Sequence, residues 1–562
     1  MSVKTHIDGN RLVLEGSGVD FLKLKAELST QLGPDAIRSE SRTVFSLDSD
    51  ALPVVQQILG LVEGGIPEDK KAEYEKQTLH DSARLKANQI IATNLASDIS
   101  DEWLEILDPA QAVAVSAMTT KNLAGLCLFD EQGIGKTVMT IAAFDELHRA
   151  GEIKKLVIVA PVTMMQGWAE EIEKFLPGKY VISVLSGDKA SKREKLYSKA
   201  DVIVCNFESL TSLLVPMRSI VKTVDTLLAV DESFNVKNKD AVRSESVREL
   251  RRYCKRGYVM CGTPAPNSAI DVIHQFNIAD NGYTFAGFTP TKDPEQLLID
   301  ISERIEQRGV YIRRLKSEVL PELPEKNFHV IHTKMESQQK TLYDDAKEKL
   351  QIELKSIDNA TFKKNLTSYF QQRSALLQIC ACPQAVDPSY SETSIKLKAL
   401  DKIVEDLVVK NGQKIVIWSF YKISLSEIFA RYKQHNPVLL DGSVTAIERA
   451  EAVREFQSNS DTMICIANPA AAGAGVTLHA ASHAVYVSFS NQAAHFLQSV
   501  DRIHRRGQDA DSVHYHIIVC QDTLEEGEIK RLREKELRQQ ELLHDNEKWP
   551  NSLDEALAEL QS

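Results

Sequence analysis

Two stretches of the chain alternate short apolar runs with segments in which apolar residues have helical spacing. In the first stretch, from about residue 100 to 290, the apolar runs include 155–160; in the second, they begin at 414–418 and continue to 483–487. Short buried strands separated by helices are typical of a parallel β-sheet covered by helices. The pattern therefore predicts two α/β lobes.

The remaining segments follow other patterns. Residues 290–395 lack a strand signal and are expected to be a mainly helical spacer, and the charged stretch 68–87 indicates a solvated connecting helix. Before about residue 65 we expect a small α+β unit, with strands at 11–14 and 43–47 and helices at 19–32 and 50–63. The expected domains are an N-terminal accessory domain, a first lobe, a helical protrusion with the inter-lobe linker, a second lobe and a helical tail, at residues 1–90, 91–290, 291–395, 396–540 and 541–562.

Composition narrows the class of protein. The 562 residues are 43% hydrophobic and 26% charged, which excludes disorder as the dominant state. A net charge of −12 excludes a uniformly basic nucleic-acid binder but allows a local basic groove. The eight cysteines are scattered, and the close pair Cys380 and Cys382 lacks a second ligand pair for zinc, so buried thiols in a reducing compartment are expected. Without a signal-peptide or membrane-length apolar run, we expect a soluble, cytoplasmic protein.

The strongest chemical signal is the segment Asp130-Glu-Gln-Gly-Ile-Gly-Lys-Thr137, between an apolar run and a helical pattern. A strand, a glycine turn and a helix are the context of a phosphate loop. Gly133 and Gly135 would let backbone N–H groups cradle phosphate, Lys136 would reach the β- and γ-phosphates, and Thr137 would hold magnesium. Asp130 replaces the first glycine of the usual pattern.

A pair of carboxylates, Asp231 and Glu232, follows the apolar run 227–230. At the end of a strand downstream of a phosphate loop, Asp231 would bind Mg²⁺ and Glu232 would polarise the water that attacks the γ-phosphorus. These elements together predict a nucleotide hydrolase.

A third element is Arg502 and Arg505, which share one helical face. They would neutralise charge on the transferred phosphoryl group. A basic helix end that balances the dipole or binds nucleic-acid phosphates explains the pair equally well.

The three elements, with further motifs in the same order, resemble the Swi/Snf-type ATPases of helicase superfamily two over about residues 104–535. The most family-specific segment, Tyr311-Ile-Arg-Arg-Leu-Lys316 through Lys326, is similar to the family's L-R-R-x-K … L-P-x-K segment. Other matching segments are 107–111, 160–168, 231–238, 261–267, 472–478 and 498–508.

The resemblance implies two RecA-like lobes around ATP and Mg²⁺ and a DNA-dependent ATPase that moves along double-stranded DNA without obligatory strand separation. It implies that Gln111 and Gln498 bind the nucleotide. The nucleic-acid contacts it implies are Thr163, Trp168, Ser419, Gly473 and Thr477. Phe234 and Cys261 depart from the usual histidine and threonine or serine, which puts the coupling of hydrolysis to nucleic-acid binding in doubt.

Three functions stay open. The chain could remodel protein–DNA complexes or branched DNA as a monomeric motor, remodel a protein machine such as RNA polymerase, or act as an ATP-dependent DNA clamp with weak hydrolysis. The N-terminal domain could select the substrate, dock a protein partner or brace the first lobe. The compact size suggests a bacterial or viral source, in which case the protein would associate with the nucleoid.

Overall fold

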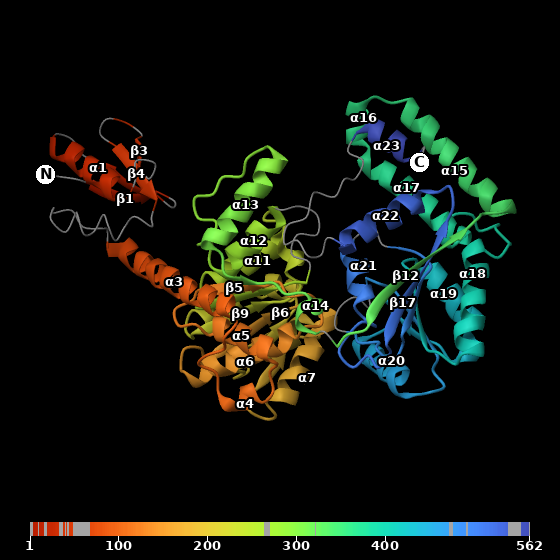
Figure 1. The fold of residues 1–562 in the computed structure, drawn as a ribbon, viewed down its shortest axis with the longest axis horizontal. Helices are drawn as coiled ribbons and strands as arrows, with labels where there is room; N and C mark the ends of the chain where they lie inside the picture. The colour runs from red at the N-terminus through yellow and green to blue at the C-terminus, as the bar shows by residue number, and fades with distance from the viewer. Residues whose placement is uncertain are drawn as a thin grey trace.

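The computed structural model contains a small N-terminal unit and two sheet-based lobes (Figure 1). It describes residues 4–8, 11–15, 19–32, 37–39, 41, 44–48, 68–262, 270–320, 322–470, 476–489, 493–537 and 552–560. Within these ranges, no helix combines the length and apolar character that crossing a bilayer requires.

The N-terminal unit is an antiparallel sheet of order β1-β2-β4-β3 with one helix. Its elements are β1 Lys4–Asp8, β2 Arg11–Glu15, α1 Val19–Leu32, β3 Ile37–Ser39 and β4 Val44–Asp48. The two predicted strands and the predicted helix at 19–32 are confirmed, whereas the helix predicted at 50–63 lies outside the described residues. Helix α3, Glu68–Thr93, connects this unit to the first lobe (Figure 1).

Lobe 1 is built on a seven-stranded parallel sheet of order β11-β5-β10-β9-β6-β8-β7. Its strands are β5 Gly125–Leu128, β6 Lys155–Val159, β7 Ile182–Val184, β8 Val202–Cys205, β9 Thr226–Val230, β10 Arg256–Met260 and β11 Tyr311–Ile312. Its helices are α4 Asp101–Leu104, α5 Pro109–Met118, α6 Lys136–Arg149, η3 Val162–Met164, α7 Met165–Phe175, α8 Lys189–Leu196, α9 Phe207–Ser212, α10 Leu214–Val221, η4 Ser233–Val236, α11 Val242–Arg251, α12 Ile270–Ala279 and α13 Pro294–Arg308. Separate apolar clusters cover the two faces of the sheet, as expected for a buried parallel sheet.

Lobe 2 is built on a six-stranded parallel sheet of order β12-β17-β16-β13-β15-β14. Its strands are β12 Glu325–Thr333, β13 Ile415–Trp418, β14 Val438–Leu440, β15 Ile464–Ala467, β16 His483–Tyr486 and β17 Ser512–Cys520. Its helices are α18 Ile395–Val404, η6 Glu405–Lys410, α19 Lys422–Arg431, η7 Lys433–His435, α20 Ala446–Ser458, α21 Ala493–Val500 and α22 Leu524–Leu537. The two predicted parallel-sheet lobes are confirmed.

The segment between the lobes is only partly helical. It contains α14 Lys316–Val319, α15 Ser337–Lys355, α16 Asn359–Lys364, α17 Leu366–Ala381 and η5 Pro383–Ala385, but also strand β12, which pairs with β17 over its full length. The expectation that 290–395 lacks strands is therefore wrong. Helix α23, Leu553–Glu559, packs against this helical group, and Arg373 forms ion pairs with Glu528 and Glu559. All eight cysteines are buried thiols outside any disulfide, as expected from the sequence.

Candidate active site

The turn between β5 and α6 has the geometry of a phosphate loop. Gly133 and Gly135 have positive φ angles of 92° and 102°, which glycine adopts without strain. A Cβ atom at Gly135 would lie 2.4 Å from Nε2 of Gln111, so only glycine fits there. Lys136 begins α6, and its ammonium group donates to the loop carbonyls of Asp130 (2.6 Å) and Glu131 (3.2 Å). The loop thus directs one lysine and the helix N-terminus toward its own concave side.

Gln111 lies in the first turn of α5 and is buried. Its side-chain amide donates to the Ile134 carbonyl at 2.7 Å, and its oxygen accepts from the Asp108 backbone N–H at 3.1 Å. The structure therefore places this predicted nucleotide-binding residue directly against the phosphate loop.

The predicted carboxylates lie where β9 ends. Asp231 accepts a hydrogen bond from the Trp168 indole N–H at 2.9 Å, and burial raises the pKa of Asp231 while this bond opposes the rise. Glu232 has a left-handed φ of 48°, and its Oε2 is buried without a partner among the described residues. Burial first, and then the neighbouring Asp231, raises the pKa of Glu232 to about 7. A buried carboxylate with one free oxygen and this pKa can accept a proton at neutral pH.

The two arginines follow α21 of lobe 2 and point toward lobe 1. Arg502 is 1% exposed and donates to Oε1 of Gln132 at 3.0 Å, while Nε2 of Gln132 donates to Oε1 of Glu232 at 3.3 Å. Gln132 thus joins the lobe 1 carboxylate to the lobe 2 guanidinium. Burial, and then the nearby charge of Arg505, lowers the pKa of Arg502 to about 9. Arg505 donates to the Thr477 hydroxyl at 3.1 Å.

In the linker, Lys316 makes two contacts that the motifs did not predict. Lys316 donates to Asp501 at 2.7 Å from a buried position, and its backbone N–H donates to Glu131 at 2.8 Å. Burial lowers the pKa of Lys316 to about 8, and the nearby lysine charges hold the pKa of Asp501 at about 2 despite its burial.

Arg314 explains the missing first glycine of the phosphate loop. Its backbone N–H and its Nε donate to Asp130 at 2.9 and 3.1 Å. Asp130 is fully buried, so it serves as the anchor for this linker arginine. The resemblance of segment 311–326 to the family pattern could have indicated the contacts of Arg314 and Lys316. Nothing in the phosphate-loop motif indicated the contacts of Gln132.

The other predicted site residues differ in their exposure. Thr137, Thr163 and Thr477 are partly exposed near the described motifs, and Gln498 is buried on α21. Gly473 lies outside the described residues.

The side chains of Trp168 and Ser419, which are predicted to contact nucleic acid, are both buried. Trp168 is 2% exposed and supports Asp231. Ser419 is fully buried, and its hydroxyl lies 2.9 Å from that of Ser424 and 3.0 Å from that of Ser488. Neither side chain reaches the surface in this structure, and the nucleic-acid contacts of Trp168 and Ser419 stay predictions. Of the two departures from the family pattern, Phe234 packs against the lobe 1 core and Cys261 is buried in it.

The donor set fits the ligands that the sequence implies. Thr137 and Asp231 offer hydroxyl and carboxylate oxygens, which are the donors that Mg²⁺ prefers. The unpartnered Oε2 of Glu232 and the two arginines suit the γ-phosphate end of ATP.

Two family models match this chain. A family model described as an SNF2-related domain matches residues 110–385, and one described as a helicase conserved C-terminal domain matches 395–507.

Three relatives illustrate the similarity. A SWI/SNF-related, matrix-associated, actin-dependent regulator of chromatin from Xenopus tropicalis is 23% identical, over 76% of this chain and 50% of the relative. An ATP-dependent helicase of Mycoplasma genitalium is 24% identical, over 72% of this chain and 39% of the relative. The human DNA annealing helicase and endonuclease ZRANB3 is 24% identical, over 77% of this chain and 40% of the relative. The chain spans about half the length, or less, of these curated relatives. The solved SWI2/SNF2 ATPase core of Sulfolobus solfataricus in complex with double-stranded DNA is 22% identical with a TM-score of 0.38, covering 79% of this chain and 94% of that one.

Proposed function

This chain belongs to the SNF2-related family of helicase-like, DNA-dependent ATPases, and we propose that it couples ATP hydrolysis to movement along double-stranded DNA, remodelling protein–DNA complexes or branched DNA without obligatory strand separation. The observation that supports this most directly is the continuous contact from Glu232 through Gln132 to Arg502, because it spans both lobes. A hydrolytic centre completed only when two lobes meet can convert the nucleotide state into lobe movement.

The chemistry is divided between the lobes. Lys136 and the loop N–H groups hold the β- and γ-phosphates, and Glu232 accepts a proton from the attacking water. Arg502 and Arg505 stabilise the charge that develops on the γ-phosphoryl oxygens, for which such arginines contribute roughly 10³–10⁵ in rate. Thr137 and Asp231 would hold Mg²⁺, which would neutralise charge on the phosphates.

The side chain of Gln132 must move away from Glu232 and Arg502 before this chemistry can occur. Its side chain lies between the carboxylate and Arg502, which is where a γ-phosphate and its attacking water would interact with these groups. Binding of ATP therefore replaces the Gln132 bridge by contacts to phosphate and draws Arg502 toward the substrate. Product release restores the bridge, so each cycle moves lobe 2 relative to lobe 1.

DNA is held through its phosphates. Thr163 after β6 and Thr477 before β16 are the partly exposed contact candidates on lobes 1 and 2. Because hydroxyl contacts to phosphate carry no sequence information, binding is largely independent of sequence.

The test measures ATP hydrolysis without DNA, with single-stranded DNA and with linear duplex, using Glu232→Gln as the blank. Movement is measured as displacement of a triplex-forming third strand from a duplex. The proposal expects strong stimulation by duplex over single strand and ATP-dependent displacement. Equal stimulation by both DNAs, or a third strand that stays bound during rapid hydrolysis, would contradict it.

A further inference from the structure

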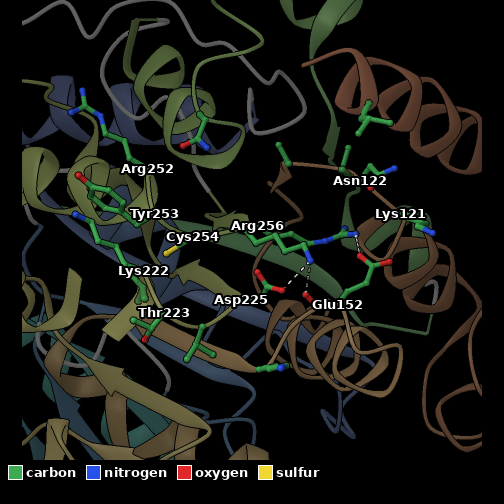
Figure 2. A pocket seen from close by; sticks show the side chains of 18 of the residues that line it. Lys121, Asn122, Glu152, Lys222, Thr223, Asp225, Arg252, Tyr253, Cys254 and Arg256 are labelled. Carbon is green, nitrogen blue, oxygen red and sulfur yellow. Dashed lines mark hydrogen bonds and ion pairs between the residues drawn. The ribbon is translucent and has the colours of Figure 1, made fainter. Parts of the chain in front are cut away.

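A cavity of about 650 Å³ lies at the edge of the lobe 1 sheet where β5, β6, β9 and β10 begin (Figure 2). The nucleotide site lies at the opposite edge, where these strands end. Lys154 precedes β6, Asp225 precedes β9 and Arg256 begins β10, so the parallel order of the strands brings these residues together. Sites for small ligands have volumes of roughly 300–1,000 Å³, so this cavity is of ligand size.

The cavity is cationic although the chain as a whole is acidic. Six lysine and arginine side chains line it, against the acidic side chains of Glu152 and Asp225. Both acids already have partners, since Arg256 pairs with Glu152 at 2.7 Å and Lys255 pairs with Asp225 at 3.3 Å. Arg252 pairs with Glu249 at 3.1 Å, which leaves three lysines of the lining without an acidic partner among the described residues.

Some basic residues at this edge have a structural role. Several helices end here, and Arg256 donates to the Met118 carbonyl at the end of α5, while the neighbouring Arg251 donates to the carbonyls of Ala124 and Ala279. Cations commonly stabilise helix ends in this way.

Three lysines have no such role. Lys121, Lys154 and Lys222 are exposed, and within the described part of the chain their ammonium groups form no ion pair or hydrogen bond. Lys222 lies 4.3 Å from the centre of the Tyr253 ring, which holds it at one wall. Figure 2 shows Lys222 and Tyr253 together at one side of the pocket and Lys121 at the other. The free cations therefore lie on two sides of the cavity.

We propose that this cavity binds a compact ligand with adjacent phosphate groups, either a free polyphosphate or the phosphorylated end of a nucleic-acid strand. Lysine ammonium groups are strong donors to phosphate, and several cations around one cavity favour a multiply charged anion over a monovalent one. This site is separate from the hydrolytic centre and does not depend on its proposed function.

The test measures binding of inorganic tripolyphosphate to the full chain by titration calorimetry. All proteins carry Lys136→Ala, so that the phosphate loop does not contribute. The test variant is Lys121→Gln, Lys154→Gln and Lys222→Gln together. The control is Lys189→Gln, Arg193→Gln and Lys199→Gln on and after α8, which removes the same charge from exposed positions elsewhere on lobe 1.

We expect the pocket variant to lose about tenfold or more in affinity and the control variant to retain it. An equal loss in both variants would show only non-specific charge attraction, and an unchanged affinity in the pocket variant would place the ligand elsewhere; either result overturns the proposal. Equal thermal unfolding temperatures of the two variants confirm that the fold is intact.

The source of the phosphate is distinguished by competition. A four-nucleotide thymidine strand is added with and without a 5′-phosphate. Displacement of tripolyphosphate by the phosphorylated strand alone identifies a strand end as the ligand, whereas no displacement by either strand identifies a free polyphosphate. Equal displacement by both strands would show that the cavity reads the strand backbone and not a phosphate cluster, which contradicts the proposal.

Discussion

Replacing Trp168 by phenylalanine separates the role that the structure gives this residue from the role that its motif implies. The change keeps an aromatic ring in the core but removes the indole N–H that donates to Asp231 at 2.9 Å. A hydrogen bond to a charged group contributes about 1.5–3 kcal/mol to stability. Because this bond also opposes the rise in the pKa of Asp231, its loss raises that pKa further and makes protons compete better with Mg²⁺.

The expected effect is on magnesium and not on DNA. Residues that orient a metal ligand typically contribute 10- to 100-fold to metal affinity, so the Mg²⁺ concentration for half-maximal ATP hydrolysis should rise by about that factor. Affinity for duplex DNA without nucleotide, measured by fluorescence anisotropy, should stay unchanged because Trp168 is buried.

Trp103 provides a matched control. It is 1% exposed and its indole N–H donates to Asp145 at 2.9 Å in the same lobe, away from the phosphate loop. Trp103→Phe should lower the free energy of unfolding without changing the Mg²⁺ requirement. If Trp168→Phe weakens DNA binding at an unchanged Mg²⁺ requirement, the structural assignment is wrong and the motif-based one is right.

Three further outcomes follow from the site. ATP hydrolysis should rise with pH through about 7, because Glu232 must lose its proton to act as a base and burial raises its pKa to about 7; Glu232→Gln, assayed across the same range, should abolish turnover and this pH dependence while nucleotide binding remains. Arg505→Ala should slow single-turnover hydrolysis by roughly 10³-fold or more with little change in ATP affinity measured by calorimetry, and equal losses in both would indicate a binding role instead. Gly135→Ala should remove ATP binding in an equilibrium assay, because the added Cβ meets Gln111 at 2.4 Å and the φ of 102° is strained for alanine; normal binding would show that the loop can rearrange.

The buried strands and the phosphate loop could be predicted because their signals are local. Apolar runs such as 155–159 and 226–230 became strands, and the glycines of the loop have the backbone angles that only glycine adopts readily. Strand β12 could not be predicted in this way, because none of its residues is buried and it includes charged and histidine side chains. Its strand conformation comes from pairing with β17, far away in the sequence.

Side-chain direction was the second limit. A motif places Trp168 and Ser419 near nucleic acid, but packing turned both side chains inward. The bridge formed by Gln132 and the contacts of Lys316 depend on how two lobes meet, which no local pattern encodes. The role of the N-terminal domain as a docking or selecting module stays a prediction.

The linker also limits how far the two lobes can move apart. Arg314 is bonded to Asp130 of lobe 1, while Glu325 begins the strand that is built into the lobe 2 sheet. The residues between them can span no more than roughly 40 Å even when fully extended. Because each end of this linker is held by one lobe, the linker limits how far the two lobes can separate between cycles of hydrolysis. Arg502 and Arg505 therefore stay near the nucleotide site between cycles. A short movement of lobe 2 is enough to bring them to a newly bound ATP.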